Sequence, residues 1–348
     1  MRVASPSVYR LTPGSEVGGE VHEVELLKRL PEHGVELALA LPAGHGWAAP
    51  PSGWRVDTVR DPRRAPWPLA PAVFLPWLRR ARADLLRGGS VRFAGPSLLL
   101  ERRRSGRPVV LHHHHLEPRW AKVELALLRA ADAVVTVSGH GRRALIAGGV
   151  APGRVHVIAN GVLAPAGRDP WPEAWPPGEG LRLLHFGRLE TRKRPDIALA
   201  VAAAAGGRLV LAGDGPLRDE LSDRGATLLG RVSEQDKWRL LDAADVLLVP
   251  SALEGFGLVA AEAQARGVPV VARAGTGVGE VVRHGETGLL VDGDEDWAAA
   301  LAALTDPATR ERLGRAAALH AARFSWDAAA ARLAELYREV VAGHSPAA

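Results

Sequence analysis

The sequence predicts an α/β protein with two doubly wound, parallel-sheet domains. Short apolar stretches rich in β-branched residues alternate with stretches of helical period, and the connections between them have ordinary lengths. Residues 164–180, APAGRDPWPEAWPPGEG, form a Pro- and Gly-rich connector, behind which the same alternation starts again. At 348 residues the chain is long enough for two domains with a hydrophobic core each.

In the first half, helical spacing is clearest at Val21, Val24, Leu27 and Leu30, which predict a helix over residues 20–30. Residues 42–76 are rich in Pro and Trp and predict no clear element. The remaining patterns predict strands at 2–8, 35–41, 109–113, 133–138 and 155–158, and further helices at 76–86, 123–130 and 142–147.

The second half repeats this pattern. A helix over 233–242 has Ser233 as its N-cap, since serine accepts hydrogen bonds from unpaired N–H groups of a first turn. Strands are predicted at 181–186, 209–212, 227–229, 246–249, 268–272 and 288–291. Other helices are predicted at 196–205, 217–224 and 258–266, from Trp297, from Arg310 and, as a long closing helix, from Trp326.

Composition excludes several classes of protein. The absence of cysteine excludes disulfides, thiolate catalysis and thiolate zinc sites. No apolar run approaches the ~20 residues that a membrane-spanning helix needs, and the first residues resemble a strand more than a targeting leader. A soluble, cytoplasmic protein is therefore expected.

The charge is unevenly divided. Lys and Arg outnumber Asp and Glu by 23 to 13 through Pro165, which gives +10, and the rest has 21 against 26, which gives −5. The basic half suggests an anionic partner, namely nucleic acid, a lipid surface or an acidic acceptor. The alternative is a solvated arginine-rich surface. Basic residues cluster from Arg60 to Arg87 and at Arg102, Arg103, Arg104 and Arg107.

The stretch 246–266, VLLVPSALEGFGLVAAEAQAR, predicts a buried strand, a glycine-containing loop and a helix. Gly255 and Gly257 leave the backbone bare where the helix begins, and Glu254 and Glu262 lie eight positions apart. Unpaired N–H groups beside carboxylates suit a phosphate that is attached to a sugar. The alternative is the ordinary strand, turn and helix of any α/β protein, with Glu254 a solvated loop acid and Glu262 an exposed helix residue.

Nearly the whole chain resembles the retaining nucleotide-sugar glycosyltransferases of family four. The matching phrases of the second half, in order, are LLHFGRLETRKRPDIALA, LVLAGDGPLRDEL, LLGRVSEQDKWRLLDAADVLLVPSALEGFGLVAAEAQARGVPVVA, GEVVRHGETGLLV and FSWDAAAARL. EVGGEVHEVELLKRL and ADAVVTVSGHGRRALIAGGVAPGRVHVIANGV resemble that family's first domain, and the likeness is weak from 42 to 107.

The resemblance implies the GT-B architecture, in which two Rossmann-like domains face each other across a cleft. Residues 1–165 are then the N-terminal, acceptor-side domain and residues 166–325 the C-terminal domain that binds the nucleotide sugar. Residues 326–348 are expected to form a closing helix that crosses back to the N-terminal domain.

Arg188 and Lys193 are predicted to bind the donor's diphosphate. They flank a turn after a strand, and by type and spacing a forked guanidinium and a compact ammonium suit two phosphates. Resemblance implies that they neutralise the leaving nucleotide. The alternative is a surface pair at a helix start, where cations are disfavoured.

Resemblance also gives the two glutamates roles. Glu262 is expected to accept the ribose hydroxyls, and Glu254 to contact the donor sugar and hold its anomeric carbon. The backbone N–H groups of Phe256, Gly257 and Leu258 are expected to point to sugar or phosphate oxygens. Residues 230–232, ending at Val232, are expected to run past the nucleobase and contact it through their backbone.

In the first domain, Gly18 and Gly19 are expected to approach the diphosphate with bare backbone. The family has a single histidine at the end of a strand, reaching the donor sugar, and counting from Pro108 matches it to His114. The chain has a run of four, His112 to His115. Alternate side chains share a face, so His112 and His114 lie on one face and His113 and His115 on the other. A metal site would need two histidines of one face plus a further ligand, and the sequence shows no such partner.

The predicted function is transfer of a hexose from a nucleoside-diphosphate sugar to an acceptor hydroxyl, with retention of configuration. His114, Arg188, Lys193 and Glu254 are the expected catalytic residues, and neither metal nor cofactor is expected. The alternative is a non-catalytic sugar-nucleotide-binding protein of the same fold. A nucleic-acid binder rests only on the +10 charge, and no nucleic-acid partner is expected.

A lipid-linked acceptor leads to a further hypothesis, peripheral contact with the inner face of an anionic membrane. Arginine mixed with tryptophan is typical of lipid interfaces. The alternative is that Phe74, Trp77, Leu78 and Leu85 pack a helix on the sheet. The residues that suggest the contact are Arg60, Arg63, Arg64, Arg79, Arg80, Arg82, Trp67, Phe74 and Trp77.

Overall fold

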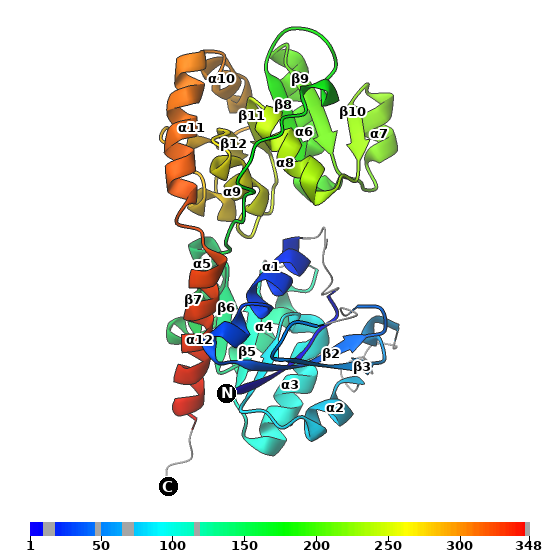
Figure 1. Cartoon of the computed structure of the whole chain (residues 1–348), viewed down its shortest axis with the longest axis vertical. Helices are drawn as coiled ribbons and strands as arrows, with labels where there is room; N and C mark the ends of the chain where they lie inside the picture. Colours follow the sequence, from blue (N-terminus) through cyan, green and yellow to red (C-terminus); the bar gives the residue numbers. More distant parts are fainter. Residues whose placement is uncertain (10–17, 46–49, 65–72, 115–118, 345–348) are drawn as a thin grey trace. The chain divides into compact units, whose positions relative to one another are not determined.

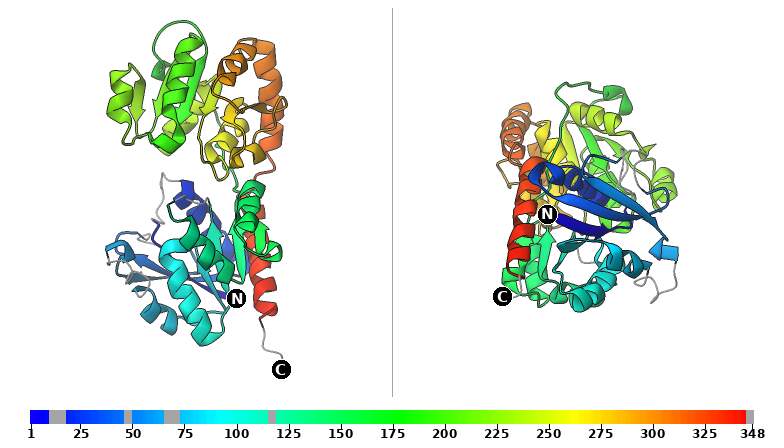
Figure 2. Two further views of the ribbon diagram at one scale, coloured as in Figure 1. Left: turned by 180° about the vertical axis from the view of Figure 1, so that it is seen from behind. Right: turned by 60° about the horizontal axis from the view of Figure 1, so that its bottom comes forward.

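The computed structural model describes residues 1–9, 18–45, 50–64, 73–114 and 119–344 (Figure 1). They form two compact units, of which the first contains Met1–Gly161 and Trp326–Ala348 and the second Val162–Ser325. The chain therefore passes into the second unit after Gly161 and returns at Trp326. The closing helix α12 (Trp326–Ala342) belongs to the first unit, and Figures 1 and 2 show it alongside that unit's sheet.

The first unit is built on a seven-stranded sheet of order β3-β2-β1-β4-β5-β6-β7, in which every pair is parallel. The order reverses between β1 and β4, the mark of a doubly wound sheet. The strands are β1 (Arg2–Pro6), β2 (Glu36–Pro42), β3 (Trp54–Val59), β4 (Leu85–Gly88), β5 (Val109–His113), β6 (Ala133–Thr136) and β7 (Val155–Val157).

Besides α12, the first unit has five α-helices among its described residues. They are α1 (Gly18–Leu27), α2 (Leu75–Arg80), α3 (Val91–Ser105), α4 (Ala121–Ala130) and α5 (Gly139–Ala147). The helix predicted over 76–86 is wrong in its second half, because the chain straightens into β4 and pairs with β1. Neither β3 nor α3 was predicted. Edge strand β3 is half exposed with no apolar run, and α3 contains Gly95 and Pro96, the poorest helix formers.

The second unit holds a six-stranded parallel sheet of order β10-β9-β8-β11-β12-β13. The predicted strands are confirmed, with ends that differ by a residue or two. They are β8 (Arg182–Phe186), β9 (Arg208–Ala212), β10 (Thr227–Gly230), β11 (Val246–Val249), β12 (Val270–Arg273) and β13 (Gly288–Val291).

The α-helices of the second unit fall where helical spacing predicts them. Ser233 caps α8 as expected, since its side chain accepts from the Asp236 N–H. The helices are α6 (Pro195–Ala204), α7 (Arg218–Asp223), α8 (Glu234–Ala243), α9 (Leu258–Ala265), α10 (Asp296–Ala303) and α11 (Pro307–Ala321).

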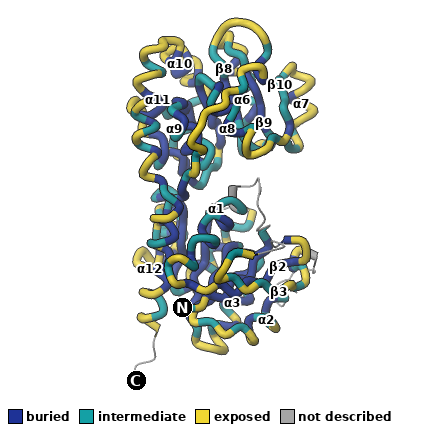
Figure 3. The backbone as a smooth tube through the Cα atoms, viewed as in Figure 1, coloured by how far each residue is buried: buried dark blue, intermediate teal, exposed yellow. Residues whose placement is uncertain are grey.

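Each unit has a core of its own. Inner strands of both sheets, such as β4 and β11, are buried, whereas helices such as α7 and α11 expose their outer turns (Figure 3). Leu183, Leu211 and Leu248 lie in the core of the second unit, and Leu86, Leu111 and Val134 in that of the first. The predicted class of two doubly wound parallel-sheet domains is confirmed. No helix in the described part of the chain is both long and apolar enough to cross a membrane.

Candidate functional site

The predicted site residues of the second unit, apart from Val232, follow the two strands between which the strand order of its sheet reverses. Strands β8 and β11 are neighbours, and the order proceeds outward from them in opposite directions. In open parallel sheets, ligands bind at this point, outside the carboxyl ends of the strands. The connection after β8 carries Arg188 and Lys193, and the connection after β11 carries Glu254.

Lys193 and Glu254 form an ion pair between these two connections. Lys193 Nζ donates to Glu254 Oε2 over 2.6 Å, and the side chains are 17% and 15% exposed. The alternative interpretation of Glu254 as a solvated loop acid is therefore wrong. A carboxylate that is balanced by an ammonium at a reversal point can stay charged while it accepts hydrogen bonds from hydroxyl groups.

Arg188 is held more loosely. Its side chain is 59% exposed, and its Nε lies 3.3 Å from Glu190 Oε2. An exposed ion pair of this kind contributes little to stability. The guanidinium can therefore leave Glu190 for a stronger anion, and a diphosphate offers two oxygens to its fork.

The loop before α9 has a geometry that only glycine permits. Gly257 caps the helix at φ +88°, and a Cβ there would lie 2.9 Å from the Val278 side chain. The Gly277 N–H donates to the Glu254 carbonyl over 2.8 Å, which fixes the loop from the other side. Helix α9 then begins at Leu258, where the first N–H groups lack helical partners and the helix dipole favours an anion. The Phe256 side chain is buried against Phe324, and the predicted contact of its backbone N–H with the donor stays a prediction.

Glu262 lies in the second turn of α9 and is 7% exposed. The alternative of an exposed helix residue is therefore wrong. Lys237 Nζ, from α8, donates to Glu262 Oε1 over 2.7 Å. Burial raises the pKa of Glu262 above its usual range, although the Lys237 ammonium opposes this by stabilising the carboxylate.

Lys237 is absent from the residues that the sequence predicted. A signal for it exists in the composition, because the chain has forty arginines and four lysines. In the second unit the lysines are Lys193 and Lys237, and each pairs with one of the predicted glutamates. The rarity of lysine could therefore have identified Lys237 as a candidate site residue.

Val232 follows β10, at the same end of the sheet. Gly230 ends that strand at φ +68°, and its carbonyl accepts from the Gly213 N–H over 2.7 Å. Val232 itself is half-buried in the short link to α8. Its position suits the predicted backbone contact with a nucleobase, which stays a prediction.

The predicted residues of the first unit lie at two places. Gly18 and Gly19 form the first turn of α1, and His114 follows β5. The His114 ring meets the His22 ring nearly at right angles, with centroids 4.6 Å apart. His22 also contacts the ring of His112, at 6.0 Å, so His112 and His114 share a face as expected. His115 lies outside the described residues.

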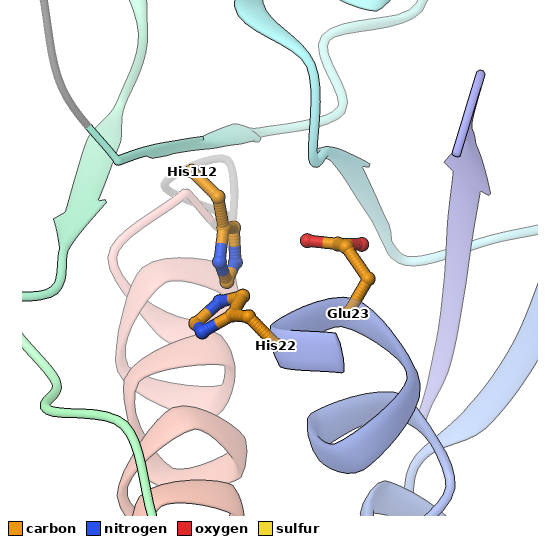
Figure 4. A group of neighbouring side chains, drawn as sticks. All are labelled: His22, Glu23 and His112. Carbon is orange, nitrogen blue, oxygen red and sulfur yellow. The ribbon is translucent and has the colours of Figure 1, made fainter. Parts of the chain in front are cut away.

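His22, Glu23 and His112 form a buried cluster whose potential ligand atoms all lie within 4.8 Å of one another (Figure 4). The expectation that no further ligand accompanies the histidine run is therefore wrong. The cluster nevertheless fits a metal poorly, because Arg87 donates to both oxygens of Glu23 over 2.7 Å. A divalent ion would have to displace a buried guanidinium, so we assign the cluster a structural role.

Buried histidines predict a loss of stability in acid. Burial lowers the pKa of His22 and His112, with Arg87 adding to the effect, and lowers the pKa of His185 to about 4. In the unfolded chain a histidine has a pKa of about 6.5, so below that pH it binds a proton that it does not bind in the folded protein. The free energy of unfolding therefore decreases as the pH is lowered. His185 is expected to cost about 2 kcal/mol between pH 7 and pH 5, and His22 and His112 act in the same direction.

The variant His185→Asn isolates one histidine. Asparagine can keep the hydrogen bond that the His185 Nδ1 makes to the Leu248 carbonyl, and it removes the titration. Urea unfolding at pH 7 and pH 5 should show a smaller loss for the variant than for the wild type. Equal losses would mean that His185 does not stay neutral in the folded protein.

The described apolar residues of the basic region belong to the core of the first unit. Phe74, Leu78 and Leu85 are fully buried, and Trp77 Nε1 donates to Asp57, as the packing alternative predicts. Arg87 is buried too, so it is unavailable to an anionic partner. Arg79, Arg80 and Arg82 are exposed, Trp67 lies outside the described residues, and membrane contact stays a prediction.

Two family models match the chain. The model "Glycosyltransferase Family 4" matches residues 17–163, and "Glycosyl transferases group 1" matches residues 168–320. Similar proteins include the D-inositol 3-phosphate glycosyltransferase of Thermobispora bispora, 40% identical over 193 residues, or 47% of this chain and 44% of the relative. The same enzyme of Acidothermus cellulolyticus is 37% identical over 259 residues, or 65% and 57%. The chain spans about half the length of the curated relatives that it matches.

Two solved structures share the fold over nearly the whole chain. HepE of Anabaena, in complex with UDP and glucose, has a TM-score of 0.74 at 20% identity and covers 97% of this chain and 100% of its own. Sucrose-phosphate synthase of Thermosynechococcus elongatus has a TM-score of 0.80 at 23% identity, with 98% and 99% covered.

Proposed function

Because the chain belongs to the group 1 glycosyltransferases of family four, with a GT-B fold, we propose that it transfers a hexose from a nucleoside-diphosphate sugar to a hydroxyl group. The transfer retains the configuration of the donor and needs neither a metal ion nor a cofactor. A cytoplasmic location is part of the same proposal.

The observation that carries this proposal is the Lys193–Glu254 ion pair beside the first turn of α9. Cation, carboxylate and unpaired N–H groups meet at the reversal point of a parallel sheet, where nucleotides bind in this class of fold. Arg188 and Lys193 bind the diphosphate, Glu254 binds the hexose and Glu262 binds the ribose. The roles of Gly18, Gly19, His114 and Val232 remain those that the family resemblance implies.

Charge on the diphosphate grows as the bond to the sugar breaks. Arg188 and Lys193 stabilise that negative charge, as a bound metal ion does in other transferases. In the proposed front-face reaction the bond from the anomeric carbon to the phosphate oxygen breaks while the acceptor oxygen attacks from the same side. The acceptor proton passes to the leaving phosphate. Glu254 is poorly suited to be a covalent nucleophile, because Lys193 already neutralises it.

The names of similar proteins suggest which substrates to try first. HepE was solved with UDP and glucose, and the curated relatives act on D-inositol 3-phosphate. We therefore propose a uridine-diphosphate sugar as the donor and a phosphorylated cyclitol as the acceptor.

The test is release of nucleotide from UDP-glucose, UDP-N-acetylglucosamine and GDP-mannose, each with inositol 3-phosphate, with free inositol and without acceptor. Release that depends on one donor and is faster with inositol 3-phosphate supports the proposal. If nucleotides raise the melting temperature but no donor is consumed under any condition, the protein is a non-catalytic binder of the same fold.

A further inference from the structure

The two lysines of the second unit both serve predicted donor glutamates, although arginine is ten times more frequent in the chain. The contrast is sharpest at Lys237, which is 7% exposed and lies where arginine would form the usual buried ion pair. What differs between the two residue types is how many carboxylate oxygens they occupy.

At a second buried glutamate, Glu23, an arginine takes both carboxylate oxygens. Arg87 donates from Nη1 to Glu23 Oε2 and from Nη2 to Glu23 Oε1, and both side chains are fully buried. A planar fork matches a carboxylate in this way and leaves its oxygens fewer sites for another partner. Glu23 is thus a structural carboxylate.

Lysine occupies a single oxygen of Glu262. Lys237 Nζ donates to Oε1, and no other described residue donates to that carboxylate. The ammonium is held from its other side by Glu234 Oε1 at 2.8 Å, and by the ring of Trp238, whose centroid lies 5.0 Å away. Trp238 Nε1 in turn donates to Glu234, so the lysine head cannot swing across to Oε2 without breaking this arrangement.

The charge of Glu262 depends on the same contact. Burial favours the protonated form of its carboxyl, and Lys237 favours the ionised form. Burial alone would lower the pKa of Lys237, but the carboxylates of Glu262 and Glu234 raise it, so the lysine stays charged. A buried carboxylate with a fixed cation on one oxygen is a strong acceptor at the other.

We propose that Lys237 is a specificity-determining residue for the ribose of the nucleotide. It binds one oxygen of Glu262, keeps the carboxylate charged, and leaves Oε2 to accept the ribose hydroxyls. The proposal rests on the proposed function, in which Glu262 is the ribose-binding residue, and it adds a residue that acts through Glu262.

The experiment compares the affinities of UDP and 2′-deoxy-UDP, measured by calorimetry on the whole chain. The wild type is expected to prefer UDP by about 10- to 100-fold, the value of a hydrogen bond to a charged group. In Lys237→Arg the fork covers both oxygens, and in Lys237→Met the carboxyl takes up a proton. Both variants should therefore bind the two nucleotides within about threefold of each other.

Three comparisons make the readout specific. Lys28→Met removes an ion pair of equal length to Lys193–Glu254, between Glu25 on α1 and Lys28 directly after that helix, and should leave the preference for UDP unchanged. In a Glu262→Gln background, Lys237→Met should cause no further loss of preference, because its partner is already gone. The affinity of Lys237→Met for UDP should recover as pH rises, whereas that of Lys237→Arg should not.

The outcomes separate the two proposals. If Lys237→Arg keeps the full preference for UDP, Lys237 supplies charge alone and the inference is wrong, while the donor site stands. If the wild type binds neither UDP nor GDP, the proposed function itself fails. Should Lys237→Met not fold, Lys237→Gln takes its place, since the amide still donates to Oε1 but leaves the carboxyl without a cation.

Discussion

Replacing Arg188 and Lys193 together by alanine is expected to lower kcat by about 10³-fold, a typical loss when preorganised charge is removed from a transition state. The affinity for the donor should fall much less, by about tenfold, because the diphosphate gains charge as it leaves. Lys193 contributes to both quantities, since it also balances Glu254 across 2.6 Å. Nucleotide release first identifies the donor. Steady-state kinetics with that donor then measure the change in kcat separately from the change in donor affinity.

Arg192 offers a matched control for this double variant. It lies between Arg188 and Lys193 in sequence, pairs with Glu190 at 2.6 Å and is 38% exposed. Arg192→Ala should change kcat by less than about threefold, because exposed ion pairs contribute little. Full activity in the Arg188→Ala, Lys193→Ala variant would place the diphosphate elsewhere.

The variant Arg87→Met is expected to lower the free energy of unfolding by about 3–5 kcal/mol, the usual cost of leaving a buried carboxylate without its cation. Arg87 donates to Glu23 from two nitrogens, to Ser5 Oγ at 3.1 Å and to the Tyr337 hydroxyl of α12 at 2.9 Å. It therefore joins β4, α1, β1 and the returning helix at one point. Urea unfolding followed by circular dichroism measures the loss.

Two further variants show whether the loss comes from the unpaired charge. Arg87→Met combined with Glu23→Leu should recover most of the stability, because no charge is then left buried. Glu36→Ala breaks the exposed pair with Arg2, whose side chains are 48% and 63% exposed, and should cost under about 1 kcal/mol. A double variant as unstable as Arg87→Met alone would assign the loss to packing.

Strands with a continuous apolar run are predicted correctly from the sequence. Strands such as β11 are buried on both faces of a parallel sheet, so their apolar runs are continuous and easy to recognise. Strand β3 is different, because this partly exposed edge strand carries Arg55 and Asp57 and shows no apolar run. Strand β4 contains the buried Arg87, whose charge hides a core position from any hydrophobic pattern.

The candidate site divides in a similar way. Local sequence places Glu254 before α9 and Glu262 on it, since both lie in one continuous motif. Their cations come from other elements, as Lys237 is 25 residues and Lys193 61 residues away from its partner. Such pairings depend on sheet order and register, which no single motif contains. The same holds for His22, which meets His112 and His114 only after the sheet has formed.

The donor site on the second unit is tested most directly by hydrogen–deuterium exchange of the whole chain with and without saturating UDP. Bound nucleotide should slow exchange in residues 186–193, 230–232 and 254–262, because these connections follow β8, β10 and β11 and supply the N–H groups that meet the ligand. Protection confined to other segments, with these three unchanged at saturation, would contradict the site.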